Sequence, residues 1–151
     1  LTQELVGDAG AFQAALANAR DILFLGDNAG EIVFDRLLIE NLPRNRITYV
    51  VRGAAVINDA TRADAEAAGI SGLVNVMDNG SDAPGTILDQ CSRDFRQAFY
   101  DADLVVAKGQ GNFESLSDIK KHIFFIFKVK CPVVAAHTDA PEGSMMIYEH
   151  F

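Results

Sequence analysis

Two adjacent oxygen-bearing side chains, Asp27 and Asn28, follow a short apolar run and precede a stretch with helical spacing. A carboxylate and an amide oxygen are ligands that hard divalent cations such as Mg²⁺ and Mn²⁺ prefer in proteins. The same residue types also begin helices, because their side chains accept hydrogen bonds from backbone N–H groups of the first turn. Taken alone, the pair indicates either a metal site or a helix N-cap.

A second polar group, comprising Arg52, Asn58 and Asp59, follows the next apolar run. Asp59 would complete a metal site with Asp27 and Asn28 if the two runs are neighbouring strands of a sheet. The planar guanidinium of Arg52 is suited to bind a phosphate group. The alternatives are that Asn58 or Asp59 caps a helix and that Arg52 forms a surface ion pair.

A third candidate is the glycine-bearing stretch from Lys108 to Glu114. It partly matches a dinucleotide-binding fingerprint, but Glu114 stands where the third glycine belongs and would repel a pyrophosphate, which argues against NAD. Its glycines expose backbone N–H groups that can bind a smaller anion, with Lys108 supplying a point charge. The alternative is a tight turn beside a solvated lysine. The segment from Asp78 to Gly85 is dense in turn formers and predicts a polar loop.

The surrounding sequence predicts the elements that position these residues. Apolar runs alternate with segments of helical periodicity, which favours a parallel sheet with helices on both faces. Ligands of such sheets bind outside the carboxyl ends of the strands, where all three polar groups fall. We predict strands over 22–25, 47–51, 73–77, 104–107, 132–136 and 145–148, and helices over 11–20, 31–41, 58–68, 86–90 and 93–100, with 123–130 open between helix and strand.

Composition limits the class of protein. The 151 residues fit one domain, 1–151, and the net charge of −8 argues against binding to nucleic acid, which needs a basic surface. A small phosphorylated ligand stays compatible with this charge, because a cation and a few basic groups can invert the field of one cleft. Two cysteines, no signal peptide and no membrane-length apolar run predict a cytoplasmic protein without a membrane partner. The three histidines show no zinc-binding spacing.

The sequence resembles the damage-control phosphatases, metal-dependent phosphatases formerly known as a domain of unknown function and related to an acidic-residue methyltransferase-like group. The resemblance rests on five blocks in order: GDNAGEIVFDRLL, VRGAAVINDAT, DNGSDAPGT, AKGQGNFE and KVKCPVVA. It runs from about Asp21 to about Gly143, which is most of the chain. Five ordered blocks are much more specific than any one of them.

The resemblance implies a three-layer α/β/α Rossmann-like core with a mostly parallel sheet. It implies a divalent metal (Mn²⁺, Mg²⁺, Ni²⁺ or Co²⁺) held by Asp27, Asn28 and Asp59, and hydrolysis of phosphate monoesters of small metabolites. Such substrates are sugar phosphates or phosphorylated cofactors, including damaged ones. We assign catalysis to Asp27, Asn28, Asp59 and Lys108, and phosphate or substrate binding to Arg52, Asn58, Lys108, Gly109, Gly111 and Asn112.

The sequence departs from the family pattern at its front end, where only about twenty residues precede the first predicted core strand. The family's helical region is therefore expected to be missing, which bears on substrate selection. The Arg-Thr-x-Lys motif of one eukaryotic branch is absent. Two other functions stay open: a phosphate- or nucleotide-binding domain without catalysis, and a protein-carboxylate methyltransferase. The sequence predicts neither the oligomeric state nor whether water or an aspartate attacks phosphorus.

Overall fold

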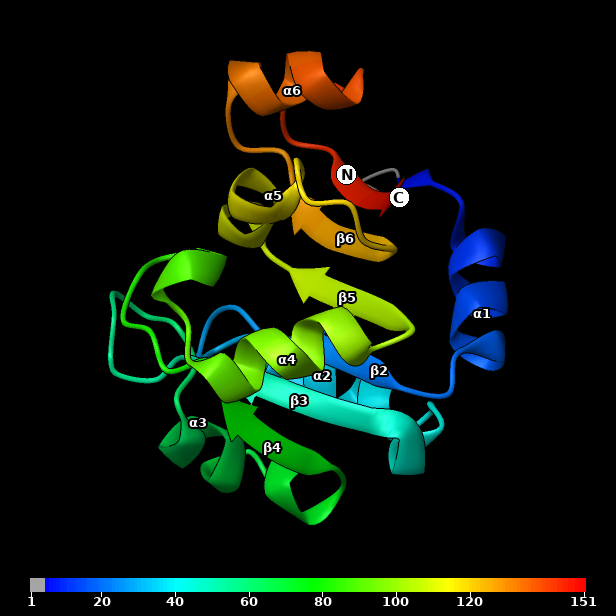
Figure 1. The fold of residues 1–151 in the computed structure, drawn as a ribbon. Coiled ribbons are helices and arrows are strands. Elements are labelled where there is room, and N and C mark those ends of the chain that lie inside the picture. Colours follow the sequence, from blue (N-terminus) through cyan, green and yellow to red (C-terminus); the bar gives the residue numbers. More distant parts are fainter. Residues whose placement is uncertain (1–4) are drawn as a thin grey trace.

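The computed structural model describes residues 5–151, which form one seven-stranded sheet (Figure 1). The strand order is β1-β7-β6-β5-β2-β3-β4, and neighbours pair in parallel except for the antiparallel pair of β6 and β7. The strands are β1 (Leu5–Gly7), β2 (Ile22–Leu25), β3 (Ile47–Val51), β4 (Asn75–Asp78), β5 (Leu104–Lys108), β6 (Ile123–Lys128) and β7 (Met145–His150).

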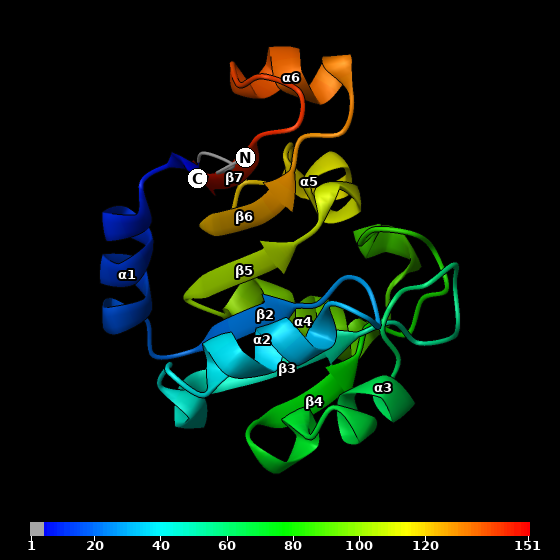
Figure 2. The same ribbon diagram turned by 180° about the vertical axis from the view of Figure 1, so that it is seen from behind.

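Helices cover both faces of the sheet, and Figures 1 and 2 show α2 and α4 on opposite sides of it. One buried core includes side chains of the first three helices, and a second core includes side chains of the last three. The predicted three-layer α/β/α architecture is therefore confirmed. The helices are α1 (Ala9–Asn18), α2 (Ile32–Ile39), α3 (Arg62–Ala67), α4 (Arg93–Asp101), α5 (Gln110–Leu116) and α6 (Pro132–Thr138), with short 3₁₀ turns at Arg44–Arg46, Ile70–Gly72 and Leu88–Gln90.

The central strand β2 shows why the strands are continuously apolar. Side chains of a strand alternate between the faces of its sheet, and both faces here are covered. Leu23 and Leu25 accordingly join one core, whereas Ile22 and Phe24 join the other, and all four are at most 2% exposed. Each side chain buried in this way stabilises the fold by roughly 1.5–3 kcal/mol.

Two element predictions are wrong, and local chemistry explains both. Residues 132–136 were predicted as a strand but begin helix α6, because Pro132 occupies the first helical turn, where its missing N–H costs nothing. The helix predicted from Asn58 begins at Arg62, since Thr61 is its N-cap and forms a capping box with Asp64.

Two further differences concern helices. The helix predicted over 86–90 is only a 3₁₀ turn at Leu88–Gln90, because the backbone of Ile87 is extended, and α5 was not among the predicted helices. The other differences concern strands. The ambiguous run 123–130 contains β6, the segment 145–148 lies within β7, and β1 was not predicted because it has only three residues. Within residues 5–151, no helix is long and apolar enough to cross a bilayer.

Candidate functional site

The loops after β2 and β3 lie side by side because these strands are neighbours in the sheet. Asn28 and Asp59 form an isolated antiparallel bridge. On either side of it, the Ala29 N–H donates to the Asn58 carbonyl and the Ala60 N–H donates to the Asp27 carbonyl, both at 2.8 Å. The structure therefore brings Asp27, Asn28 and Asp59 together, as a joint site requires.

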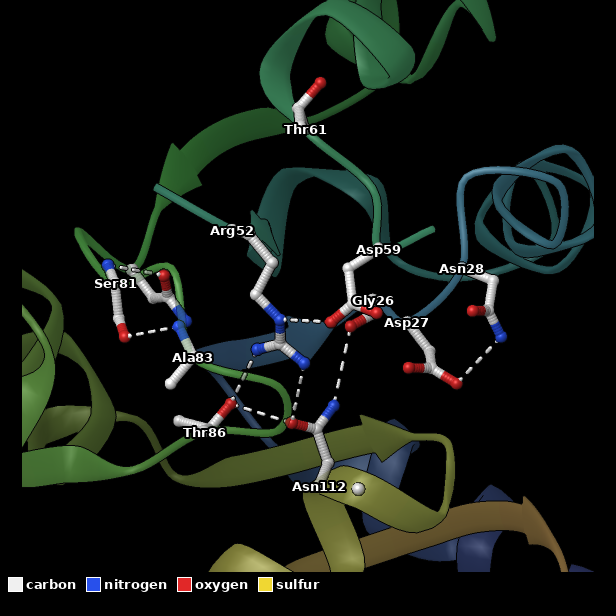
Figure 3. A network of polar contacts seen from close by, with 12 residues as sticks. Gly26, Asp27, Asn28, Arg52, Asp59, Thr61, Ser81, Ala83, Thr86 and Asn112 are labelled. Carbon is white, nitrogen blue, oxygen red and sulfur yellow. Dashed lines mark hydrogen bonds and ion pairs between the residues drawn. The ribbon is translucent and has the colours of Figure 1, made fainter. Parts of the chain in front are cut away.

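None of these three side chains caps a helix. The N-cap of α2 is Glu31, which makes no side-chain capping bond, and the N-cap of α3 is Thr61. The Asp27 carboxylate instead accepts a hydrogen bond of 3.1 Å from the Asn28 amide (Figure 3). The capping alternative left open by the sequence is thus excluded for all three.

The Asp27 carboxylate lies in an electrostatically unfavourable place. Burial, together with the nearby charges of Asp59 and Glu31, raises its pKa to about 6, against the opposing effects of Arg52 and Lys130. A carboxylate crowded by two others is a group that a bound cation would stabilise.

The donor set at this point fits an oxygen-ligated divalent cation. Within residues 5–151, no three His, Cys, Asp or Glu side chains gather into a metal site, so a cation here needs the amide oxygen of Asn28, and water, in addition to the carboxylates of Asp27 and Asp59. Such mixed oxygen sets suit Mg²⁺ and Mn²⁺. Gly109 keeps the space beside Asp27 open, because a Cβ on this residue would lie 2.0 Å from Asp27 Oδ2.

A cleft of about 300 Å³ opens beside Asp27. Glu31 and Lys108 share its wall, apolar side chains of β6 and β7 form another part, and Lys128 and Lys130 add positive charge. The sequence prediction missed these last two lysines because residues 123–130 were open between helix and strand, so the carboxyl end of β6 could not be located. Hollows of about 380 and 530 Å³ occur elsewhere, but none of their lining residues is a buried charged side chain.

Lys108 is buried rather than solvated, being 7% exposed. Its ammonium donates to Glu31 and, at 2.8 Å, to Asp35 Oδ1, while the Tyr49 hydroxyl donates to Asp35 Oδ2 at 2.7 Å. Burial acts to lower the pKa of Lys108, but the two carboxylates outweigh it and raise that pKa. The lysine is therefore a charged group fixed at the cleft wall.

The other residues of the glycine-bearing stretch contact the rest of the protein more closely than a solvated turn would, and helix α5 begins among them, at Gln110. The Gly109 N–H donates to the Ile126 carbonyl at 3.0 Å, within the sheet edge. The Gly111 carbonyl packs against Gly85, where an added Cβ would lie 2.5 Å from it, and Asn112 is fully buried. From the stretch between Lys108 and Glu114, the residues that line the cleft are Lys108, Gly109 and Gln110.

Arg52 and Asn58, both predicted to bind phosphate or substrate, do not line the cleft beside Asp27. Asn58 is exposed and holds the loop after β2 through its carbonyl. Arg52 is 4% exposed and pairs with Asp59, the distance from Nε to Oδ2 being 2.7 Å (Figure 3). The predicted surface ion pair is therefore a buried one.

The loop from Asp78 to Gly85 is polar, as predicted, but much of it lies inside the molecule. Asn79 and Ser81 are at most 5% exposed, and Asn79 Oδ1 accepts hydrogen bonds from the N–H groups of Gly53 and Ser81. The loop is thereby attached to the segment that follows β3.

Comparisons with known proteins identify the relatives of this chain. Residues 2–146 match the damage-control phosphatase ARMT1-like domain. The chain is 42% identical to the damage-control phosphatase PH1575 of Pyrococcus horikoshii, over 85% of this chain and 46% of that protein. It is 41% identical to a damage-control phosphatase of Archaeoglobus fulgidus, over 83% of this chain and 45% of that protein.

A solved structure extends the likeness to three dimensions. The crystal structure of a DUF89 family protein from Pyrococcus horikoshii matches with a TM-score of 0.90 and 37% identity, covering 95% of this chain and 52% of that one. The chain spans about half the length of the relatives it matches. Since the domain match extends over nearly all of its residues, the chain belongs to the damage-control phosphatase ARMT1-like family.

Proposed function

We propose that this chain is a divalent-metal-dependent phosphatase that hydrolyses phosphate monoesters of small metabolites, sugar phosphates or phosphorylated cofactors among them. The observation that carries the proposal is the convergence of Asp27, Asn28 and Asp59, none of which caps a helix, beside a cleft with basic side chains. Membership of the family supports the reaction class. The two named phosphatases among the relatives support it as well.

Asp27, Asn28 and Asp59 would hold Mn²⁺, Mg²⁺, Ni²⁺ or Co²⁺. When bound, the cation neutralises phosphoryl oxygens and orients an attacking water. The chain itself supplies the remaining charge stabilisation, which is the main demand of phosphoryl transfer.

The lysines of the cleft would bind the phosphate. Lys128 and Lys130 attract an anion into a cleft that also contains two carboxylates. Lys108 is held from behind by the buried Asp35, whereas its other acceptor, Glu31, has a side chain that is 37% exposed. A phosphoryl oxygen can therefore replace Glu31 as acceptor while Asp35 keeps the ammonium in place.

The nucleophile is water or the carboxylate of Asp27 or Asp59. Attack by a carboxylate would form an aspartyl-phosphate, which water then hydrolyses. Borohydride reduction of protein quenched during turnover converts an aspartyl-phosphate into homoserine, and it leaves free aspartate unchanged. Homoserine at position 27 or 59 identifies the covalent route, and its absence during turnover identifies water.

The test of the function is hydrolysis of p-nitrophenyl phosphate with each of the four metals and with chelator. We expect turnover that depends on metal, and we expect Asp27→Ala to abolish it while weakening Mn²⁺ binding at least about tenfold. The matched control is Asp21→Ala, because Asp21 is exposed and lies at the other end of β2. Turnover that survives chelation, or a fully active and fully metal-binding Asp27→Ala protein, would overturn the proposal.

A phosphate-binding domain without catalysis gives a different result in the same assay. It would bind Mn²⁺ and inorganic phosphate, yet show no turnover with any ester or metal. Binding of S-adenosylmethionine in calorimetry would instead favour carboxylate methylation.

A further inference from the structure

Arg52 makes more hydrogen bonds than its pairing with Asp59 requires. Its Nε donates to Asp59 Oδ2 at 2.7 Å, Nη1 donates to Thr86 Oγ1 at 3.1 Å, and Nη2 donates to Asn112 Oδ1 at 3.3 Å (Figure 3). Each of its three nitrogens thus already donates to the protein. A guanidinium bound in this way is fixed in both position and plane, because its fork has one rigid geometry.

The two neutral partners of Arg52 are themselves held. Thr86 and Asn112 are at most 1% exposed, and the Thr86 hydroxyl donates to Asn112 Oδ1 at 2.7 Å. The Asn112 amide nitrogen donates to the Lys108 carbonyl at 2.7 Å and to the Gly26 carbonyl at 3.4 Å. The cluster therefore ties the guanidinium to the ends of β2 and β5 and to the loop after β4.

The backbone of Asp59 is held by the bridge to Asn28 and by a hydrogen bond from its N–H to the Val56 carbonyl at 3.0 Å. Its side chain, by contrast, has no hydrogen-bond partner other than Arg52 within residues 5–151. Its Oδ2 is taken by Arg52, and its Oδ1 has no hydrogen-bond partner among residues 5–151. The orientation of this carboxylate therefore depends on Arg52, which leaves Oδ1 as the oxygen available to a ligand.

We propose that Arg52 is a positioning residue for the metal site, which orients the Asp59 carboxylate toward the cation while Thr86 and Asn112 fix the guanidinium. This assignment rests on the proposed function and replaces the phosphate-binding role predicted for Arg52 from the sequence. It also gives the loop after β4 a role, since that loop supplies Thr86. Outer partners of this kind typically change metal affinity by about 10–100-fold when they are lost.

The test is Thr86→Val, which removes the hydroxyl behind Arg52 and touches neither Asp27, Asn28 nor Asp59. Mn²⁺ affinity is measured by calorimetry and by electron paramagnetic resonance of the bound ion. We expect the affinity to fall about tenfold, with kcat restored at saturating Mn²⁺ and KM for p-nitrophenyl phosphate unchanged. Thr86→Ser keeps the hydroxyl and should have wild-type Mn²⁺ affinity. This result would show that the weaker binding of Thr86→Val comes from the missing hydroxyl and not from a general loss of stability.

Two further variants keep the test decisive. Thr138→Val removes a hydroxyl that donates to the Val134 carbonyl within α6, and it should leave Mn²⁺ affinity unchanged. Arg52→Lys keeps the charge but loses the fork, so it should weaken Mn²⁺ binding more than it raises KM. If Arg52→Lys instead raises KM and weakens inhibition by inorganic phosphate at unchanged Mn²⁺ affinity, Arg52 is a phosphate ligand and the positioning role is wrong.

The outcomes also separate this inference from the proposed function. A wild-type protein that binds Mn²⁺ without hydrolysing any ester contradicts the phosphatase proposal, while the effect of Thr86→Val on Mn²⁺ affinity still decides the role of Arg52. A wild-type protein with metal-dependent turnover, combined with a Thr86→Val protein of normal Mn²⁺ affinity, contradicts the positioning role alone.

Discussion

Two buried, positively charged side chains, those of Arg52 and Lys108, lie on either side of β2, and their hydrogen-bond partners differ. Arg52, after β3, contacts one carboxylate and two neutral oxygens that come from three segments of the chain. Lys108, at the end of β5, contacts two carboxylates, one within α2 and one at its N-cap. The first cluster joins segments, whereas the second concentrates charge.

The charge balance of the two clusters differs accordingly. Arg52 and Asp59 form a neutral pair, but Lys108 faces both Glu31 and Asp35. Burial raises the pKa of Asp35 even though Lys108 acts to lower it. Stability should therefore depend more on the charge of Lys108, and the geometry of the site more on the shape of Arg52.

The largest expected effect is that of Lys108→Met. This change leaves Asp35, 2% exposed, without its counter-charge, and removing one partner of a buried pair costs about 3–5 kcal/mol. Urea denaturation in chelator measures the free energy of unfolding. Lys120→Met is the control, since Lys120 is exposed and should lose under about 0.5 kcal/mol.

A smaller loss is expected for Arg52→Met. The Thr86 hydroxyl still donates to Asn112 in this variant, and the Asp59 side chain, 9% exposed, can turn toward the cleft. We therefore expect a loss of about 2–3 kcal/mol in the same denaturation experiment, against under about 0.5 kcal/mol for the exposed Arg44→Met. A loss larger than that of Lys108→Met would reverse the comparison of the two clusters.

More of the region around Asp59 and Arg52 could be predicted from the sequence than of the region around Lys108. Apolar runs and turn residues located β2, β3 and β5, and strand adjacency then brought Asp27, Asn28 and Asp59 together. The partners of Lys108 could not be predicted in this way. Asp35 lies inside the helical pattern EIVFDRLLIEN, where an acidic residue usually marks the solvated face, and only tertiary packing decides that it is buried.

The burial of polar loops could not be predicted from the sequence, for a similar reason. Turn composition predicts where the chain bends, but it does not distinguish a loop in solvent from one packed against a strand end. Thr86 and Asn112 therefore gave no signal as partners of Arg52. Helix α6 differs from the predicted strand because the β-branched residues after Pro132 favour a strand, whereas the proline itself favours the first turn of a helix.

Tyr49→Phe tests how far the Lys108 cluster reaches into the core. Tyr49 is fully buried, and its hydroxyl donates to Asp35 at 2.7 Å. Loss of a hydrogen bond to a charged group costs about 1.5–3 kcal/mol, so we expect a value near the lower end because Lys108 still compensates Asp35. Tyr100→Phe is the matched control, as Tyr100 is 57% exposed. Equal stability of the two variants would show that Lys108 alone holds Asp35.

The smallest loss of stability is expected for Asp64→Ala, which removes the carboxylate of the α3 capping box and can be compared with the buried carboxylate of Asp35. Asp64 accepts hydrogen bonds from the Thr61 hydroxyl at 2.7 Å and from the Thr61 N–H at 2.8 Å, and these lower its pKa from 3.8. Removing this capping contact should cost about 1 kcal/mol near neutral pH.

The pH dependence of that loss has a definite sign. A carboxyl whose pKa is lowered by folding stabilises the fold above its unfolded pKa, and it loses this contribution as the pH falls through the folded value. The stability difference between wild type and Asp64→Ala should therefore vanish only in acid below 3.8. The raised pKa of Asp35 has the opposite sign, because stabilisation linked to it is complete below 3.8 and is lost as the pH rises through the folded value. Denaturation of wild type, Asp64→Ala and Asp35→Asn across this range separates the two, and parallel pH profiles for both variants would show that burial does not distinguish the two carboxylates.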